Sequence, residues 1–263
     1  MTTALGPNNF HIELPISDGK PVVDAAEFGV HPENPSNGAA FARAIEHCRS
    51  IGAAKLVLPK GVYRFDDGEH LLFRGLKDFV LDGQGSELVF SIPRSFVNIT
   101  GCERVLFRDF IIDWDWQKQP LARIAQITQV APGFESFDVL FPEHDEIPDD
   151  LRFRDMIPMH QRTLPPGCPR GFEFHETVVE DHREKVTPNT LRLFCRRPEH
   201  MTFLSEGQTY RMRHFVYDAN GISMDSNQHL TLEDITIYSA PGHALISSGD
   251  QHHWQLLHCS LKR

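Results

Sequence analysis

The chain has 263 residues and a mass of 30.0 kDa, enough to bury a sizeable hydrophobic core. Its 26 basic and 36 acidic residues give a formal net charge of −10, which argues against a nucleic-acid partner, because binding to phosphates needs clustered lysine and arginine. No apolar run approaches the roughly 20 residues of a membrane span, and the first residues lack a secretory signal. We therefore expect no membrane partner and a cytoplasmic protein as written, or a secreted or periplasmic one if the N-terminus was trimmed.

Cysteine and histidine do not form a recognisable metal motif. The cysteines are scattered and include no CxxC pair: Cys48, Cys102, Cys168, Cys195 and Cys259. This pattern indicates neither a disulfide framework nor a zinc knuckle. A histidine run at His252 and His253, with His229, His243 and His258 nearby, fits no standard zinc spacing. We expect no metal and no cofactor.

Short apolar runs bounded by glycine and proline, at 18 residues each, predict a mostly β protein. Residues 22–65 also contain one helical stretch. The i, i+3, i+4, i+7 spacing of a buried helix face is present at Phe41, Ala44, Ile45 and Cys48. The sequence therefore predicts one amphipathic helix laid over β structure near the N-terminus.

A short phrase recurs along the chain and consists of an apolar strand, a brief bend and a second strand. Its copies begin at Lys77, Glu103, Gln228 and His253. The strands that start at Phe79 and Val105 are 26 residues apart, and those that start at Leu230 and Gln255 are 25 apart, as in solenoids. Stacked coils of this kind share one continuous core. The alternative is an antiparallel sandwich, which also has short, regularly spaced strands.

Residues 117–209 interrupt the repeat with strands of their own and with proline-rich and acidic stretches. This segment is too long for a loop in a compact fold. We interpret it as an inserted small β domain, a barrel or a short sandwich. The predicted domains are then residues 1–116, with the N-terminal cap and the first coils, the insertion at 117–209, and a continued solenoid at 210–263.

Four fragments in the same order resemble the N-terminal signature of the pectate-lyase-like β-helix superfamily: Asp24-Ala-Ala-Glu-Phe-Gly-Val30, Asn37-Gly-Ala-Ala-Phe-Ala-Arg-Ala-Ile45, Lys55-Leu-Val-Leu-Pro59 and Gly61-Val-Tyr-Arg-Phe65. Within it, an insertion after Asp113-Trp-Asp-Trp116 and the later segment Ile235-Thr-Ile-Tyr-Ser-Ala-Pro-Gly242 resemble glycoside hydrolase family 110. The resemblance implies a right-handed parallel β-helix solenoid with an N-terminal helix cap and an inserted small β-barrel-like domain. It also implies an inverting exo-α-galactosidase that acts on terminal galactosides.

The family's catalytic acids lie in coils after the Ser-x-Pro-Gly segment, and this sequence stops at Arg263 before any matching acidic pair. The resemblance therefore implies the N-terminal part of such an enzyme, without its main catalytic acids. An apolar strand pattern at residues 254–261 would leave an uncapped solenoid edge. We expect missing coils or another subunit to cover that edge.

Two aspartates are candidate catalytic residues within the chain. Inverting glycosidases use two carboxyl groups about 6.5 to 9.5 Å apart. Asp225 and Asp250 are 25 residues apart, each just before a strand of its coil, so stacking would place them one rung apart. The alternative is a pair of turn aspartates whose side chains bond to nearby backbone.

The motif Asp113, Trp114, Asp115 and Trp116 is a candidate substrate-binding site. In an extended segment, alternation would place both acids on one face and both indoles on the other, where they could bind sugar hydroxyls and sugar faces. Alternatively, the tryptophans pack the junction with the insertion. We also assign His243 to substrate binding, as part of a polar groove lining.

Three functions remain as hypotheses. The first is a glycoside hydrolase-like protein that binds an oligosaccharide or glycan. The second is a non-catalytic carbohydrate-binding or structural β-helix, for which aromatic stacking without a productive acid pair is expected. The third is a polysaccharide lyase or polygalacturonase, which would need a basic groove for uronates, and the net charge of −10 weighs against it.

Overall fold

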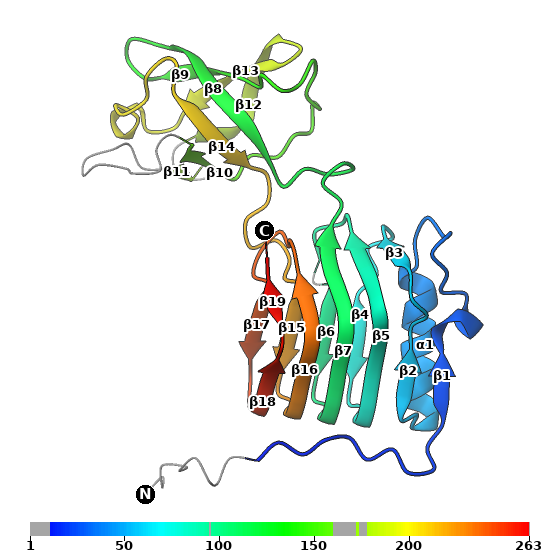
Figure 1. The fold of residues 1–263 in the computed structure, drawn as a ribbon. Helices are drawn as coiled ribbons and strands as arrows, with labels where there is room; N and C mark the ends of the chain where they lie inside the picture. Colours follow the sequence, from blue (N-terminus) through cyan, green and yellow to red (C-terminus); the bar gives the residue numbers. More distant parts are fainter. Residues whose placement is uncertain (1–10, 95, 160–171, 174–177, 263) are drawn as a thin grey trace, which may run out of the picture. The chain divides into compact units, whose positions relative to one another are not determined.

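The computed structural model describes residues 11–94, 96–159, 172–173 and 178–262 (Figure 1). Among these residues the chain forms many strands and a single α-helix, which confirms the predicted mostly β class. The chain divides into two compact units. We call residues Met1–Gln119 with Tyr217–Arg263 the parallel unit, and residues Pro120–Val216 the antiparallel unit.

The parallel unit contains two sheets, and every strand pair described in them runs parallel. The larger sheet has the order β1 (Val22–Asp24), β2 (Lys55–Val57), β5 (Lys77–Phe90), β7 (Glu103–Trp114), β16 (Gln228–Ile237) and β18 (His252–Leu257), with β3 (Val62–Phe65) beside β5 and β19 (Ser260–Leu261) beside β16. The smaller sheet has the order β17 (Leu245–Ser248), β15 (Ile222–Asp225), β6 (Val97–Thr100) and β4 (Leu71–Arg74). From β4 to β7, and again from β15 to β18, the chain alternates between the two sheets (Figure 1).

The corners between strands recur at matching positions. Residues with positive φ fall into one row at Gly75, Gly101, Ser226 and Gly249, a second at Asp78, Arg104, His229 and His253, and a third at Asp109, Asp234 and His258. The first row shows how the parallel register produces this pattern. The residues just before its members are in register with one another: Arg74, Thr100, Asp225 and Ser248. A single left-handed residue redirects an extended chain sharply, and costs about 1–2 kcal/mol where it is not glycine. The same backbone turn therefore recurs at corresponding strand ends.

Aromatic side chains pack together in the core of the parallel unit. Phe65 stacks on Phe90 with ring centroids 4.7 Å apart, Phe90 stacks on Phe96 at 4.1 Å, and Phe96 stacks on Trp114 at 6.0 Å. All four side chains are buried. Burial of large aromatic surfaces from successive strands gives the parallel unit a continuous core.

The N-terminal helix α1 (Gly38–Ile51) lies at the β1–β2 end of the sheets (Figure 1). Its predicted face is confirmed, because Phe41, Ala44, Ile45 and Cys48 are all buried. The helix ends where Gly52 takes a left-handed conformation, with φ of 63°, and its backbone N–H donates to the Cys48 carbonyl.

The antiparallel unit is a curled half-barrel of seven strands. Their order is β11 (Phe172–Glu173), β10 (Asp155–Pro158), β14 (Thr209–Arg213), β8 (Ala122–Val130), β9 (Ser136–Leu140), β13 (Thr190–Cys195) and β12 (Val178–Thr187). We predicted that the solenoid resumes at residue 210. Strand β14 instead pairs with β8 and β10, because Tyr210 and Met212 are buried in the core of this unit. Cys168 lies outside the described residues.

The register of the last coil differs by one residue from the repeat that we predicted. Gln228 pairs with His252, and Leu230 pairs with Trp254 instead of Gln255. The left-handed corner explains the difference, since His253 takes the place of His229 and fixes the alignment of the strand that follows.

A buried asparagine links distant segments of the parallel unit. Asn227, which is fully buried, accepts a hydrogen bond from the Cys102 N–H at 2.8 Å, and its amide donates to the Ile99 carbonyl at 2.8 Å and to Gln251 Oε1 at 2.9 Å. We expect Asn227→Ala to lower the free energy of unfolding by about 2–4 kcal/mol, because it leaves two buried backbone groups without partners. Urea denaturation measures this loss.

Gln251→Ala is the comparison for Asn227→Ala: it removes the oxygen that accepts from the Asn227 N–H and from the Asn227 amide, each at 2.9 Å, and leaves the bonds to Cys102 and Ile99 in place. We expect a smaller loss, about 1–2 kcal/mol, because one buried backbone group loses its partner instead of two. Equal losses for the two variants would contradict the role assigned to Asn227.

Candidate functional site

A serine joins the acid and an indole of the candidate binding motif. The Ser239 hydroxyl, which follows strand β16, donates to Asp113 Oδ1 at the end of β7. The Ser239 hydroxyl oxygen also accepts hydrogen bonds from the Trp114 N–H at 3.3 Å and from Trp116 Nε1 at 3.1 Å. Ser239 is buried, whereas Asp113 and Trp116 are half-buried. Asp113 and Trp116 are therefore held in place through one hydroxyl, a role that the sequence analysis did not assign to Ser239.

The predicted alternation of acids and indoles ends at Trp114, where strand β7 ends. After this point the chain turns, and the Trp116 N–H donates a hydrogen bond to the Trp114 carbonyl at 3.0 Å. Trp114 is packed in the aromatic core, while Trp116 shares a hydrogen-bond partner with Asp113. The prediction that both indoles share a face is wrong for this reason, since Trp114 packs against Phe96 in the core of the parallel unit.

Asp115 has partners of its own. Its carboxylate accepts from Arg64 Nη1 at 2.6 Å and from the Lys118 N–H at 3.0 Å. Its backbone N–H donates to the Phe90 carbonyl at 2.9 Å. These bonds hold Asp115 in the turn after β7 and use both of its carboxylate oxygens. The hydrogen bonds to Asp113 use Oδ1, so Asp113 has more capacity to accept from a sugar hydroxyl.

His243 belongs to an exposed aromatic pair. Its ring stacks on the Tyr217 ring with centroids 5.0 Å apart and planes 24° apart, and 72% of Tyr217 is exposed. The His243 backbone N–H donates to Asn220 Oδ1 at 3.2 Å, and ring atom Nδ1 lies 3.3 Å from the same oxygen. If Nδ1 carries the proton and donates to Asn220, Nε2 is left as an acceptor for a ligand hydroxyl.

Glycine is required beside this pair. A Cβ atom on Gly242 would lie 2.4 Å from the Ala219 carbonyl oxygen and 3.2 Å from the Tyr217 Cα atom. The close backbone approach brings His243 next to Tyr217 and Asn220. The Asn220 carbonyl in turn accepts from the Phe96 N–H at 3.0 Å, which anchors the segment to the core.

The two candidate catalytic aspartates do not occupy one row. Asp225 in β15 is in register with Ser248 in β17, and the Ser248 hydroxyl donates to Asp225 Oδ1 at 3.1 Å. Asp250 is exposed and lies two residues farther on, with its backbone N–H donating to Ser226 Oγ at 3.2 Å. The prediction of one rung between Asp225 and Asp250 is therefore wrong, because this coil is shorter than 25 residues.

Other acids of the parallel unit are committed to ion pairs. Asp78 lies 2.6 Å from Arg104 and 3.3 Å from Lys20, and Asp82 lies 2.7 Å from Arg108 and 3.2 Å from Lys55. The Arg104 guanidinium, with the Ile16 N–H and Lys20, lowers the pKa of Asp78 to about 2. An acid held in its charged form in this way cannot donate a proton near neutral pH.

One group of side chains could approach a metal ion. Glu233, Asp234 and His258 each offer a ligand atom, and these atoms lie within 4.8 Å of one another. Asp234 and His258 are exposed, and no further observation points to an ion, so we assign no metal to this corner. Within the described residues, no helix is both long and apolar enough to span a membrane.

We expect Ser239→Ala to lower the free energy of unfolding by about 1–2 kcal/mol, since it removes a donor to Asp113 and an acceptor for Trp116. Loss of this bond should also free the Trp116 ring, which a red shift in tryptophan fluorescence would report. Ser247→Ala, at an exposed serine, is the matched control. An unchanged emission spectrum in Ser239→Ala would contradict the proposed anchoring of Trp116.

Comparison with known proteins shows similarity to glycoside hydrolases, although no family model matches the chain. Two curated relatives are each named alpha-1,3-galactosidase B. The protein from Parabacteroides distasonis is 26% identical over 258 residues, which cover 85% of this chain and 41% of the relative. The protein from Bacteroides thetaiotaomicron is 20% identical over 263 residues, which cover 86% of this chain and 41% of the relative. The chain thus spans about two fifths of the length of the curated relatives it matches.

These relatives support the predicted relationship to glycoside hydrolase family 110. A solved structure from Parabacteroides merdae, described as a candidate glycosyl hydrolase, aligns with 92% of this chain and 96% of its own at 10% identity. Its TM-score of 0.34 is too low to carry an argument about the fold.

Proposed function

We propose that the chain is the N-terminal part of an inverting exo-α-galactosidase that acts on terminal galactosides. The observation that carries this proposal is the similarity to two alpha-1,3-galactosidases over about 85% of the chain. The proposal includes a right-handed parallel β-helix for the parallel unit. The alternation between two parallel sheets and the rows of left-handed corners support that architecture.

In this proposal the substrate contacts Asp113, Trp116 and His243. Asp113 offers a carboxylate for sugar hydroxyls, and Trp116 offers part of an indole that Ser239 holds in place. The stacked rings of Tyr217 and His243 offer an exposed flat surface with an imidazole acceptor. Trp114 and Asp115 would act by supporting these groups, through the core and through Arg64.

Asp225 and Asp250 remain candidates for chemistry within this chain. Asp225 ends β15 and Asp250 follows β17, whereas His243 precedes β17 and lies beside Gly221, which precedes β15. The two carboxylates therefore lie at the opposite end of these strands from His243, and Ser248 already binds Asp225. We expect Asp225→Asn and Asp250→Asn to change galactoside hydrolysis less than tenfold if the main acids lie in further coils, since one hydrogen bond to a substrate is worth about 1 kcal/mol.

We also propose that further coils or another subunit cover the last coil. Trp254, Leu256 and Leu261 are exposed by 37%, 41% and 64%. Their register partners in β16 are Leu230, Leu232 and Ile237, which are buried. A coil of the same kind on β18 would bury these three side chains in the same way.

A non-catalytic carbohydrate-binding β-helix is the second candidate. The exposed Tyr217–His243 pair favours it, because ring stacking binds a sugar without an acid pair. A lyase or polygalacturonase is less well supported. Such enzymes need free cations for uronates, whereas Arg64, Arg104 and Arg108 are already paired with carboxylates.

The deciding experiment measures galactose release from nitrophenyl α-galactoside and from α-1,3-linked galactobiose. It uses this chain and a version extended through the following coding sequence. Activity of the extended version alone supports the proposal, and β-galactose as the first product seen by proton NMR supports inversion. If neither version releases galactose, the galactosidase proposal fails, and binding measurements then test the second candidate.

The binding residues are tested in whichever version is active. We expect His243→Ala and Trp116→Ala to raise KM, with His258→Ala as a matched control at an exposed histidine. Equal effects of His243→Ala and His258→Ala would argue against a substrate site at His243.

A further inference from the structure

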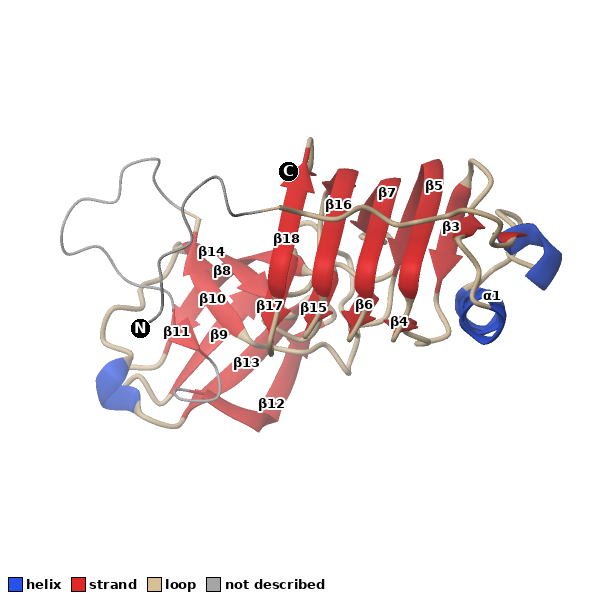
Figure 2. Cartoon of the chain, turned by 90° about the horizontal axis from the view of Figure 1, so that it is seen from below, coloured by secondary structure: helices blue, strands red, loops and turns tan. Residues whose placement is uncertain are grey.

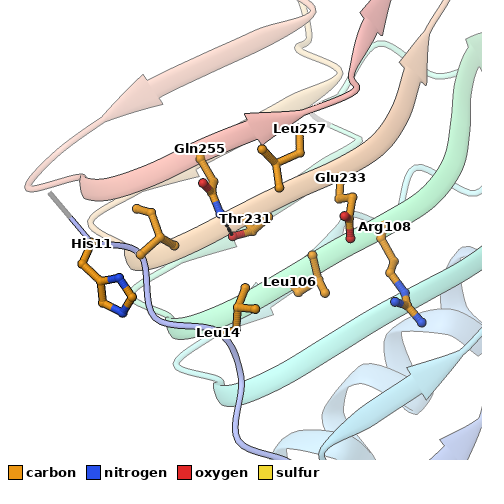
Figure 3. Close-up of a pocket in the computed structure, with 9 residues that line it drawn as sticks. His11, Leu14, Leu106, Arg108, Thr231, Glu233, Gln255 and Leu257 are labelled. Carbon is orange, nitrogen blue, oxygen red and sulfur yellow. Dashed lines mark hydrogen bonds between the residues drawn. The ribbon is translucent and has the colours of Figure 1, made fainter. Parts of the chain in front are cut away.

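A pocket lies on the outer face of the larger sheet, beneath the segment that we call the strap, residues 11–20 (Figure 3). Its volume is about 510 Å³, within the range of small-molecule sites. Strands β7, β16 and β18 supply its floor as two rows, one of Leu106, Thr231 and Gln255 and one of Arg108, Glu233 and Leu257. The floor is rigid, because these residues stand on neighbouring paired strands.

The strap crosses the strands of the sheet (Figure 2) and is fastened outside the pocket. The Glu13 N–H donates to His229 Nδ1 at 3.1 Å, and the Ile16 N–H donates to Asp78 Oδ1 at 3.3 Å. Lys20 also pairs with Asp78 at 3.3 Å. The strap residues His11 and Leu14 also line the pocket (Figure 3), so the cavity lies between the strap and the sheet.

The charges around the pocket are balanced. Arg108 pairs with Asp82 at 2.7 Å, and Asp82 pairs with Lys55 at 3.2 Å. Glu233 is in register with Arg108, whose positive charge acts on it, but in the described part of the chain its carboxylate accepts no hydrogen bond. A half-buried carboxylate that accepts no hydrogen bond from the protein needs a donor from water or a ligand. With a cation nearby, this pocket favours an uncharged ligand that brings hydroxyl donors.

The remaining floor groups fit the same chemistry. Gln255 Nε2 donates to Thr231 Oγ1 at 3.0 Å, which leaves the Thr231 hydroxyl hydrogen and the Gln255 carbonyl for other partners. Leu106 and Leu257 lie beside these polar groups and offer apolar surface. A sugar ring combines hydroxyl groups at its edge with C–H groups on its face, and so matches this mixture.

We propose that the pocket under the strap binds an uncharged saccharide, at a site separate from Asp113, Trp116 and His243. The choice of a saccharide as the ligand rests on the proposed function. The pocket would hold a further sugar of a glycan or a second glycan chain. The Glu233 carboxylate accepts from ring hydroxyls, Thr231 and Gln255 bind a neighbouring hydroxyl, and the leucines contact the ring face.

The test is ligand-observed NMR with galactose, α-1,3-galactobiose and glucose on the whole chain. We expect Leu106→Trp, which fills the pocket, to abolish binding to this site. Ile111→Trp, at a half-buried position farther along β7 that does not line the pocket, should leave binding unchanged. Thr231→Val combined with Glu233→Gln should weaken binding at least about tenfold while the fold is kept.

The outcomes separate this site from the proposed function. Binding that survives Leu106→Trp but is lost in His243→Ala belongs to the other site and overturns the proposal, as does absence of binding to all three sugars. Saccharide binding that is sensitive to Leu106→Trp, in a protein that never releases galactose, keeps the pocket and rejects the galactosidase. If galactose is released and saccharide binding is unchanged in Leu106→Trp, the galactosidase proposal is kept and the pocket proposal is rejected.

Discussion

Trp114→Ala is expected to lower the free energy of unfolding by about 3–5 kcal/mol, the usual range for a buried tryptophan. Trp114 is 2% exposed and extends the stack of Phe65, Phe90 and Phe96. Its indole Nε1 also donates to the Gln119 carbonyl. Removal of this ring therefore opens a cavity at the end of the core and leaves a carbonyl without its donor. Urea denaturation followed by circular dichroism measures the loss.

Trp116→Ala is the matched comparison, two residues along the chain. Trp116 is half-buried and bonds to Ser239, so we expect a loss below about 1.5 kcal/mol in stability. Saccharide binding should respond in the opposite order, with Trp116→Ala weakening it and Trp114→Phe, which keeps a large ring in the core, leaving it unchanged. Similar stability losses in the two alanine variants would mean that the indoles play one common role.

Local patterns in the sequence predicted the elements whose signal lies within a few residues. The face of helix α1 follows from its 3.6-residue period, and Gly52 ends it where the chain must turn left-handed. Short apolar runs predicted the strands in the same way, and the mostly β class is confirmed. Such signals depend only on residues that are neighbours along the chain, so they can be recognised in a single sequence.

Register could not be predicted in this way, because coil length is not constant. Ile222 pairs with Leu245, 23 residues on, whereas Gln228 pairs with His252, 24 residues on. A spacing of 25 residues therefore does not place Asp225 and Asp250 in one row. The corners that set these lengths include Arg104, His229 and His253 at positive φ. Histidine adopts this conformation more often than most residues but far less readily than glycine, so these residue types do not mark a corner in the sequence.

The candidate site was predicted in part for a related reason. Asp113, Trp116 and His243 are of residue types that bind sugars, and they could be found by type. Ser239, Asn220 and Tyr217 act through contacts between distant segments, with Ser239 more than 120 residues from Asp113. A buried serine that organises an acid and an indole has no sequence signal beyond its place in the Ser-x-Pro-Gly segment.

Acidification is expected to remove about 3 kcal/mol of stability from the antiparallel unit between pH 6.5 and pH 4, through His214. His214 is 1% exposed, and burial lowers its pKa to about 4, against the opposing effect of its bond to the Arg152 carbonyl. The positive charge of Arg123 lowers the pKa further. Ring atom Nδ1 lies 2.7 Å from the Arg152 carbonyl, while Nε2 is buried without a partner among the described residues.

Stability falls with falling pH because the folded unit favours the neutral form of His214. Above pH 6.5 His214 is neutral whether the unit is folded or unfolded, so its contribution is fully present. Below this value the unfolded chain takes up a proton that the folded unit excludes, and stability falls until the pH passes the folded pKa of about 4.

Urea denaturation of the chain and of His214→Asn across this pH range measures the effect. Asparagine can donate to the Arg152 carbonyl but does not titrate, so other acid-sensitive groups affect both proteins alike. We expect the stability difference between the two proteins to shrink by about 3 kcal/mol as the pH falls from 6.5 to 4. Parallel pH curves would contradict this prediction, because they would mean that His214 takes up its proton in the folded unit as readily as in the unfolded chain.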